Sequence, residues 1–124
     1  MRRAHKELDV WKLSMELVVD IFQVVDMFPK KELFGLSMQM KRCAVSIPSN
    51  IAEGAGRKTK REFRNFLYIA QGSLNELDTQ LEIARKLGYL KEDKYKELQE
   101  KVLRVGQMLS GLIKKQTKGI KDEK

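Results

Sequence analysis

Residues 59–88, TKREFRNFLYIAQGSLNELDTQLEIARKLG, decide the fold of this 124-residue chain. Thr59 and Glu62 have the spacing of a capping box, in which the threonine hydroxyl and the glutamate carboxylate each satisfy a free backbone N–H. The apolar residues that follow recur at steps of three and four, which places them on one helix face. They are Phe63, Leu67, Ala70, Leu74, Leu77, Leu81 and Ala84. Glycine favours helix C-termini, so Gly88 completes a predicted helix over about 60–87.

The same apolar spacing predicts three more helices, over about 9–28, 31–54 and 92–115. The expected core faces are Leu8, Trp11, Met15, Val18, Phe22 and Val25 in the first; Leu36, Met40, Cys43, Ile47 and Ile51 in the second; and Tyr95, Leu98, Val102, Val105, Leu109 and Leu112 in the last. The polar residues 116–124 predict a frayed tail.

Pro48 lies inside the second predicted helix. Proline has no N–H to bond to the carbonyl of Ala44, so we expect a kink or a restart at this point. Asn50 and Glu53 lie one turn apart around it. We interpret both as structural residues that satisfy the freed carbonyls or bridge two subunits.

Short connections around Pro29, Gly56 and Gly88 force consecutive helices to lie antiparallel. No segment has a strand pattern. The fold class is therefore all-α, and the chain is predicted to be a single domain over 1–124, an up-down-up-down antiparallel four-helix bundle.

The second and third helices are expected to fold back on each other about Arg57. Cys43 then lies near Gly72, and small residues at such a site let two helices approach closely. Arg42 lies at the same level and within reach of Glu76. An ion pair with Glu76, buried or at an interface, is the structural interpretation of Arg42.

The chain has 25 basic and 17 acidic residues, a net charge of +8. Such a surplus attracts polyanions, of which nucleic acid is the commonest in a cell. The alternative is a small basic protein that is merely soluble. One cysteine and one histidine exclude a disulfide framework and a zinc site of the Cys/His kind, so we expect no metal and no cofactor.

No apolar run reaches the roughly 18 residues that a membrane span needs. The N-terminal segment is amphipathic and contains Asp9, Glu16 and Asp20, which a signal peptide would lack. We therefore expect a cytoplasmic location and no membrane partner.

No common catalytic or nucleotide-binding motif is complete in this sequence. Residues 54–59, GAGRKT, lack the lysine that directly follows the last glycine of a Walker A loop, and Thr59 replaces the third glycine of a dinucleotide fingerprint. A di-metal bundle needs Glu-x-x-His on two helices, and His5 is the only histidine. We expect no enzyme activity. The alternative is a metal-dependent nuclease whose site is built from acidic residues alone.

The turn between the second and third predicted helices is the best candidate site. Its basic residues are Arg57, Lys58, Lys60, Arg61 and Arg64, and Lys41 extends the basic character along the second helix. Free N–H groups at the start of the third helix also favour anions, so phosphates would fit there. The alternative is a solvated basic turn. A second cationic group, Lys114, Lys115, Lys118, Lys121 and Lys124, binds polyanions without specificity or does nothing.

Several apolar residues lie off the predicted faces or at their edges. They are Val10, Leu17, Val24, Phe34, Met38, Phe66, Ile69, Leu103 and Ile113. They suggest a second buried surface, which in so small a bundle means self-association. A monomer with broad apolar stripes is the alternative.

Residues 46–54, SIPSNIAEG, form a long and specific motif, and related pattern elements extend over 35–89 and upstream to Asp9-Val10-Trp11 and Phe28-Pro29. With them the chain resembles the four-helix bundle proteins encoded in intervening sequences of bacterial 23S rRNA genes. That family is similar to accessory proteins of diversity-generating retroelements. The resemblance implies a ring-shaped homopentamer with a basic surface and a nucleic-acid-associated role.

We therefore predict a non-enzymatic homo-oligomer that binds structured RNA or DNA. The alternative is a protein-interaction scaffold, for example an adaptor for a reverse transcriptase.

Overall fold

The computed structural model describes residues 4–122. They form α1 (Asp9–Val25), α2 (Leu36–Ala55), α3 (Lys60–Lys86) and α4 (Glu92–Asp122), with short 3₁₀ helices η1 (Ala4–Glu7) and η2 (Lys30–Glu32). Within this range there is no strand, so the protein is all-α with four α-helices, as predicted. None of the helices formed by these residues is long and apolar enough to cross a membrane.

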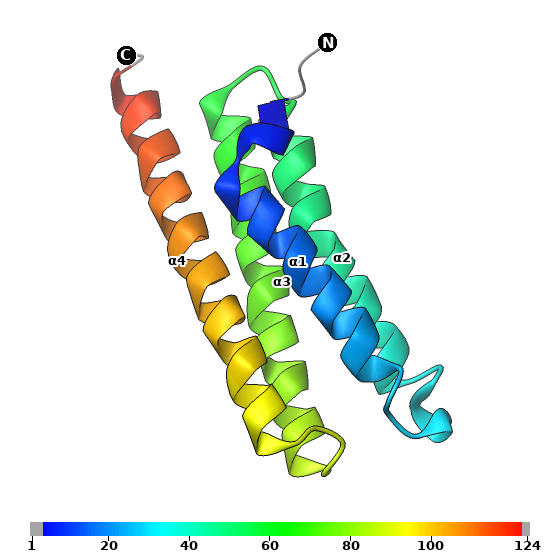
Figure 1. The fold of residues 1–124 in the computed structure, drawn as a ribbon. Helices are drawn as coiled ribbons and strands as arrows, with labels where there is room; N and C mark the ends of the chain where they lie inside the picture. Colours follow the sequence, from blue (N-terminus) through cyan, green and yellow to red (C-terminus); the bar gives the residue numbers. More distant parts are fainter. Residues whose placement is uncertain (1–3, 123–124) are drawn as a thin grey trace.

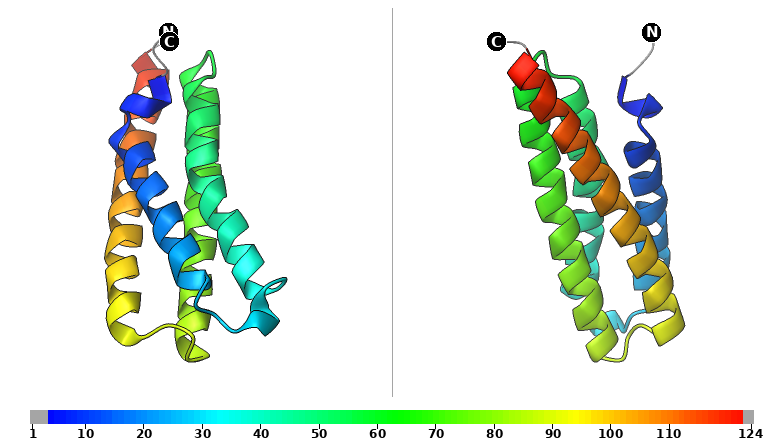
Figure 2. Two further views of the ribbon diagram at one scale, coloured as in Figure 1. Left: turned by 45° about the vertical axis from the view of Figure 1, so that its right-hand side comes forward. Right: turned by 90° about the vertical axis from the view of Figure 1, so that its left-hand side faces the viewer.

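Each helix packs against its neighbour in the chain, and α4 closes the bundle by packing against α1 (Figure 1). The start of α1, the α2–α3 turn and the end of α4 all lie at one end, in each of the views in Figures 1 and 2. Hydrogen bonds join Arg64 to Thr117 and Gln71 to Ser110. The residue numbers rise on α3 as they fall on α4, so this pair of helices is antiparallel.

The start of α3 is where the sequence places it. Thr59 Oγ1 accepts the N–H of Glu62 at 3.1 Å, as a capping threonine does. The carboxylate of Glu62 accepts the Thr59 hydroxyl at 3.0 Å, so the reciprocal bond of the box goes to the side chain.

The connection between α1 and α2 is longer than predicted. Helix α1 ends at Val25, and Phe28 is buried with its ring 5.4 Å from that of Tyr89. Glu32 bonds the N–H of Leu36 at 3.4 Å and the hydroxyl of Tyr89 at 2.8 Å. The predicted helices over 9–28 and 31–54 were wrong at this connection because these tertiary contacts draw the chain out of helical geometry.

The predicted frayed tail over 116–124 was wrong over residues 116–122, which continue α4 as far as Asp122. Gln116 and Ile120 are buried, so the helix gains packing on one face although the other is rich in lysine. Residues 123–124 lie outside the described range.

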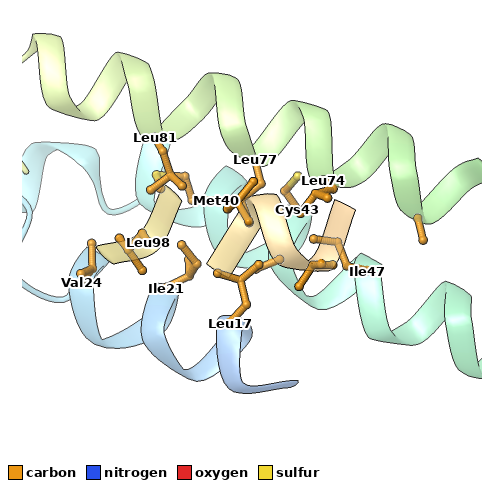
Figure 3. Packing of buried hydrophobic residues seen from close by; sticks show 14 of the residues in the cluster. Leu17, Ile21, Val24, Met40, Cys43, Ile47, Leu74, Leu77, Leu81 and Leu98 are labelled. Carbon is orange, nitrogen blue, oxygen red and sulfur yellow. The ribbon is translucent and has the colours of Figure 1, made fainter. Parts of the chain in front are cut away.

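Among residues 4–122, all buried apolar side chains except Ile120 form one cluster, to which all four α-helices contribute (Figure 3). The predicted faces of α2, α3 and α4 point into it or pack against it.

The face predicted for α1 was wrong at Met15 and Phe22, which are 40% and 38% exposed, whereas Leu17, which lies off that face, is 0% exposed. Val25 is buried as predicted, and Leu8, Trp11 and Val18 pack against the core. The other buried residues of α1 form the row Val10, Ser14, Leu17, Ile21 and Val24. Its spacing is also three and four, but Ser14 interrupts the apolar pattern.

Ser14 tolerates full burial because its hydroxyl donates to the carbonyl of Trp11 at 2.8 Å. A buried hydroxyl with a partner avoids most of the cost of desolvation. A polar residue can therefore occupy the centre of the core row on α1.

Cys43 is on the side of α2 that packs against α3 and is only 6% exposed. Its thiol donates to the carbonyl of Ser73 at 3.0 Å. Burial, reinforced by the carboxylate of Glu76, raises the pKa of Cys43 from 9.0 to about 12. As the pH rises, the Cys43 thiol of the unfolded chain therefore loses its proton before that of the folded protein does. The contribution of the Cys43 thiol to the free energy of unfolding is fully present below pH 9. It falls as the pH rises from 9 towards 12.

We expect this loss to reach about 1–2 kcal/mol near pH 10.5. Urea unfolding of the wild type and Cys43→Ala between about pH 8 and pH 10.5 measures it, because only the wild type carries this part of the pH dependence. Parallel pH profiles for the two proteins would contradict it.

Candidate nucleic-acid interface

The α2–α3 turn carries the predicted basic residues at one end of the bundle (Figure 1). Helix α2 ends at Ala55, and Thr59 caps the start of α3. Arg57 and Lys58 therefore belong to the connection itself, and both are exposed. The turn presents charge to solvent rather than to the core.

Arg57 is held by two neighbours within the turn. Its Nη2 lies 2.7 Å from Glu53 Oε1, and its guanidinium lies 4.9 Å from the centroid of the Phe66 ring. By contrast, Lys58 and Arg61 are exposed, and neither forms an ion pair with any residue in the described range. These two cations are the most available to a phosphate.

The start of α3 is less open to anions than the sequence suggests. The N–H of Glu62 is already bonded to Thr59, and the Glu62 carboxylate lies in the first helical turn. A negative charge there competes with a bound phosphate. Anion binding at this end therefore depends on side chains more than on the helix terminus.

Two basic residues in the first two turns of α3 contact α4. Arg64 Nη1 donates to Thr117 Oγ1 at 3.3 Å. The side chain of Lys60 runs beside Gly119, where an added Cβ would come within 2.6 Å of Lys60 Cδ. These contacts bring the C-terminal turns of α4 against the basic turn.

The two cationic groups that look separate in the sequence thus lie at one end of the bundle, which we call the basic end. It consists of Arg57, Lys58, Lys60, Arg61, Arg64, Lys114, Lys115, Lys118 and Lys121. The predicted helix over 92–115 ended too early to bring these two groups together. The continuing three-and-four spacing of Ile113, Gln116 and Ile120 was the signal that could have revealed the longer helix. Lys124 lies outside the described residues.

Lys41 does not join the basic end. It lies near the start of α2, with its Nζ 3.6 Å from Asp26 and 5.2 Å from the centroid of the Phe22 ring. Arg42 beside it is exposed. The ion pair expected between Arg42 and Glu76 is not formed in the described structure, where Glu76 instead accepts the Cys43 thiol at 3.4 Å.

Helix α2 runs through the buried Pro48 without a restart, and the predicted kink stays a prediction. Asn50 Nδ2 donates to the carbonyl of Ser46 at 2.7 Å rather than to that of Ala44. Glu53 faces the basic turn. Within this motif, Asn50 therefore bonds to the backbone of α2, whereas Glu53 lies at the candidate site.

At the opposite end of the bundle, Arg85 belongs to a network of ion pairs and hydrogen bonds that joins α3 to α4. Arg85 pairs with Glu82 and lies 3.6 Å from Glu92, and Tyr95 donates its hydroxyl to Glu82. The hydrogen bond from Tyr95, with that from Arg85, lowers the pKa of the Glu82 carboxyl. This end joins α3 to α4 and leaves the guanidinium of Arg85 paired.

Comparison with known proteins places this geometry in a family. Residues 6–111 match the 23S rRNA-intervening sequence proteins. A crystal structure of a protein of unknown function from the S23 ribosomal protein family of Bacteroides thetaiotaomicron is 26% identical, with a TM-score of 0.79 over 85% of this chain and 95% of that one. No curated protein matches. Since the family match spans α1 to α3 and most of α4, the chain belongs to the 23S rRNA-intervening sequence protein family.

Proposed function

We propose that this protein binds nucleic acid through phosphate contacts at the basic end, without catalysing a reaction. The supporting observation is that α4 brings its lysines against the α2–α3 turn, which gathers cations from two distant parts of the chain. Phosphate contacts of this kind set affinity and salt dependence rather than sequence preference. Structured RNA or DNA is therefore the expected partner.

We also propose that the protein self-associates through the exposed apolar stripe of α1 and its neighbour on α2. Met15, Val19 and Phe22 lie on one side of α1, and Phe22 borders a hollow with Val45 of α2. The homopentameric ring that the resemblance implies would cover such a stripe. It would also present several basic ends to one nucleic acid, so that weak contacts add by avidity.

Removing charge at the basic end tests the nucleic-acid proposal. The variant replaces Lys58, Arg61 and Lys118 by glutamine, all three exposed. We expect binding to weaken about tenfold at moderate salt, and the slope of log affinity against log salt to shrink by roughly one for each phosphate that the variant no longer neutralises. Fluorescence anisotropy with a labelled RNA hairpin and a matched DNA duplex measures both quantities.

The matched control removes the same charge at the other end of the bundle. It replaces Lys30, Lys31 and Lys96, which are also exposed, by glutamine. Equal losses of affinity in the two triple variants would mean that only net charge matters. If the wild type does not bind either probe near physiological salt, the basic end is a solvated surface and the scaffold hypothesis takes its place.

A further inference from the structure

An open groove runs between α3 and α4 and begins beside the basic end. Its volume is about 570 Å³, within the range of small-molecule sites. Its polar lining includes Gln71, Asn75, Gln99, Gln107, Ser110 and Lys114. Amide groups carry both donors and acceptors, which are the groups that read the edges of nucleobases.

The faces of α3 and α4 that form the groove continue toward the basic end, where both become cationic. On α3 a single face carries Arg61, Arg64, Tyr68, Gln71 and Asn75, at steps of three and four. On α4 the corresponding face carries Lys121, Lys118, Lys114, Gly111 and Gln107. Of these residues, Gln71, Asn75, Gln107, Gly111 and Lys114 line the groove, whereas Tyr68 and the other cations lie just beyond it, toward the basic end.

Hydrogen bonds across the groove show that the two faces oppose each other. Arg64 bonds to Thr117 at the cationic part, and Gln71 lies 3.5 Å from Ser110 at the neutral part. Farther along, Gln99 bonds to Asp78, whose carboxylate would repel a phosphate. A nucleic-acid backbone is thus favoured at one end of the groove only.

Tyr68 stands at the point where the cationic part gives way to the neutral part. It is 49% exposed, and no hydrogen bond or ring contact to it exists among residues 4–122. A Cβ added at Gly72 or Gly111 would meet no described atom within 4 Å, so there is room on both helices. An exposed aromatic ring next to cations is the arrangement on which unpaired bases stack.

We propose that this groove receives unpaired nucleotides of the nucleic acid held at the basic end. The phosphates lie against Arg61, Lys118 and Lys114, one base stacks on Tyr68, and the amides of Gln71 and Gln107 contact base edges. This inference rests on the proposed function and adds a substrate class to it: RNA or DNA with a single-stranded segment, bound in preference to a continuous duplex.

The test compares a single-stranded oligonucleotide with a duplex of the same length and label, by anisotropy at one salt concentration. Tyr68→Ala is expected to weaken single-strand binding about tenfold, the loss of one base–aromatic stack, and to leave duplex binding unchanged. Tyr68→Phe keeps the ring and should bind as the wild type does. Ile83→Ala, which removes an exposed side chain near the C-terminal end of α3, away from the basic end, is the matched control.

The outcomes separate this inference from the proposed function. If the basic-end variant weakens binding but Tyr68→Ala lowers neither affinity, or lowers both equally, the groove inference fails and the proposed function stands. If the basic-end variant has no effect, the proposed function itself fails. If Tyr68→Ala changes the size of the assembly in light scattering, the groove is an interface between copies, which overturns the inference.

Discussion

Replacing Leu17 by alanine is expected to lower the free energy of unfolding by about 3 kcal/mol, whereas Met15→Ala should cost less than about 0.5 kcal/mol. Leu17 is 0% exposed and packs in the centre of the core (Figure 3), while Met15 is 40% exposed. Removal of a fully buried leucine leaves a cavity that its neighbours fill only in part. An exposed methionine leaves no cavity.

Urea unfolding followed by circular dichroism gives both values. The face predicted for α1 from apolar spacing alone requires the reverse order, with Met15→Ala the more damaging variant. Repeating the measurement at several protein concentrations separates assembly from folding, because only a contribution from self-association depends on concentration. Equal losses of stability for the two variants, independent of concentration, would contradict the packing of α1 described above.

Gly54→Ala is expected to destabilise the protein by about 2 kcal/mol, although alanine is the better helix former. A Cβ at Gly54 would lie 2.6 Å from Cβ of Phe66 and 3.2 Å from the backbone carbonyl oxygen of Phe63. Neither is the free end of a flexible side chain, so α2 and α3 must move apart. The loss of packing outweighs a propensity gain of up to about 1 kcal/mol.

Gly72→Ala is the matched control, since Gly72 lies inside α3 and an added Cβ there meets no described atom within 4 Å. The same exchange should stabilise that site by roughly 0.5–1 kcal/mol. Thermal unfolding of the two variants beside the wild type decides the matter. A stabilising Gly54→Ala would mean that α2 and α3 do not approach as closely as the structure shows.

This pair of glycines also corrects an expectation from the sequence. The predicted alignment of α2 with α3 was close to the observed one, since the Cys43 thiol bonds to the carbonyl of Ser73, next to Gly72. Gly72 is nevertheless exposed, and the close approach of α2 and α3 occurs at Gly54. Residue size shows where two helices can approach, but their relative rotation decides where they do.

Much of the fold could be predicted because its signals are local. The Thr59 cap and the repeating steps of three and four in α3 act within a few residues, and they place that helix to within one residue of its observed end. The candidate turn could be predicted for the same reason, since its cations lie within eight residues of one another. The α1–α2 connection could not, because Phe28 and Glu32 contact Tyr89, about sixty residues away.

The sequence by itself determined the number of helices, the start of α3, the core faces of three helices and the cationic character of the α2–α3 turn. Tertiary structure alone decided which of two equally spaced rows of α1 is buried, how far α4 extends, and that its lysines join the turn at one end. The physical reason is that periodicity and capping depend on neighbours in the chain. The choice of buried face depends on the contact free energy with other helices, where a satisfied Ser14 can lie in the core and an exposed Met15 outside it.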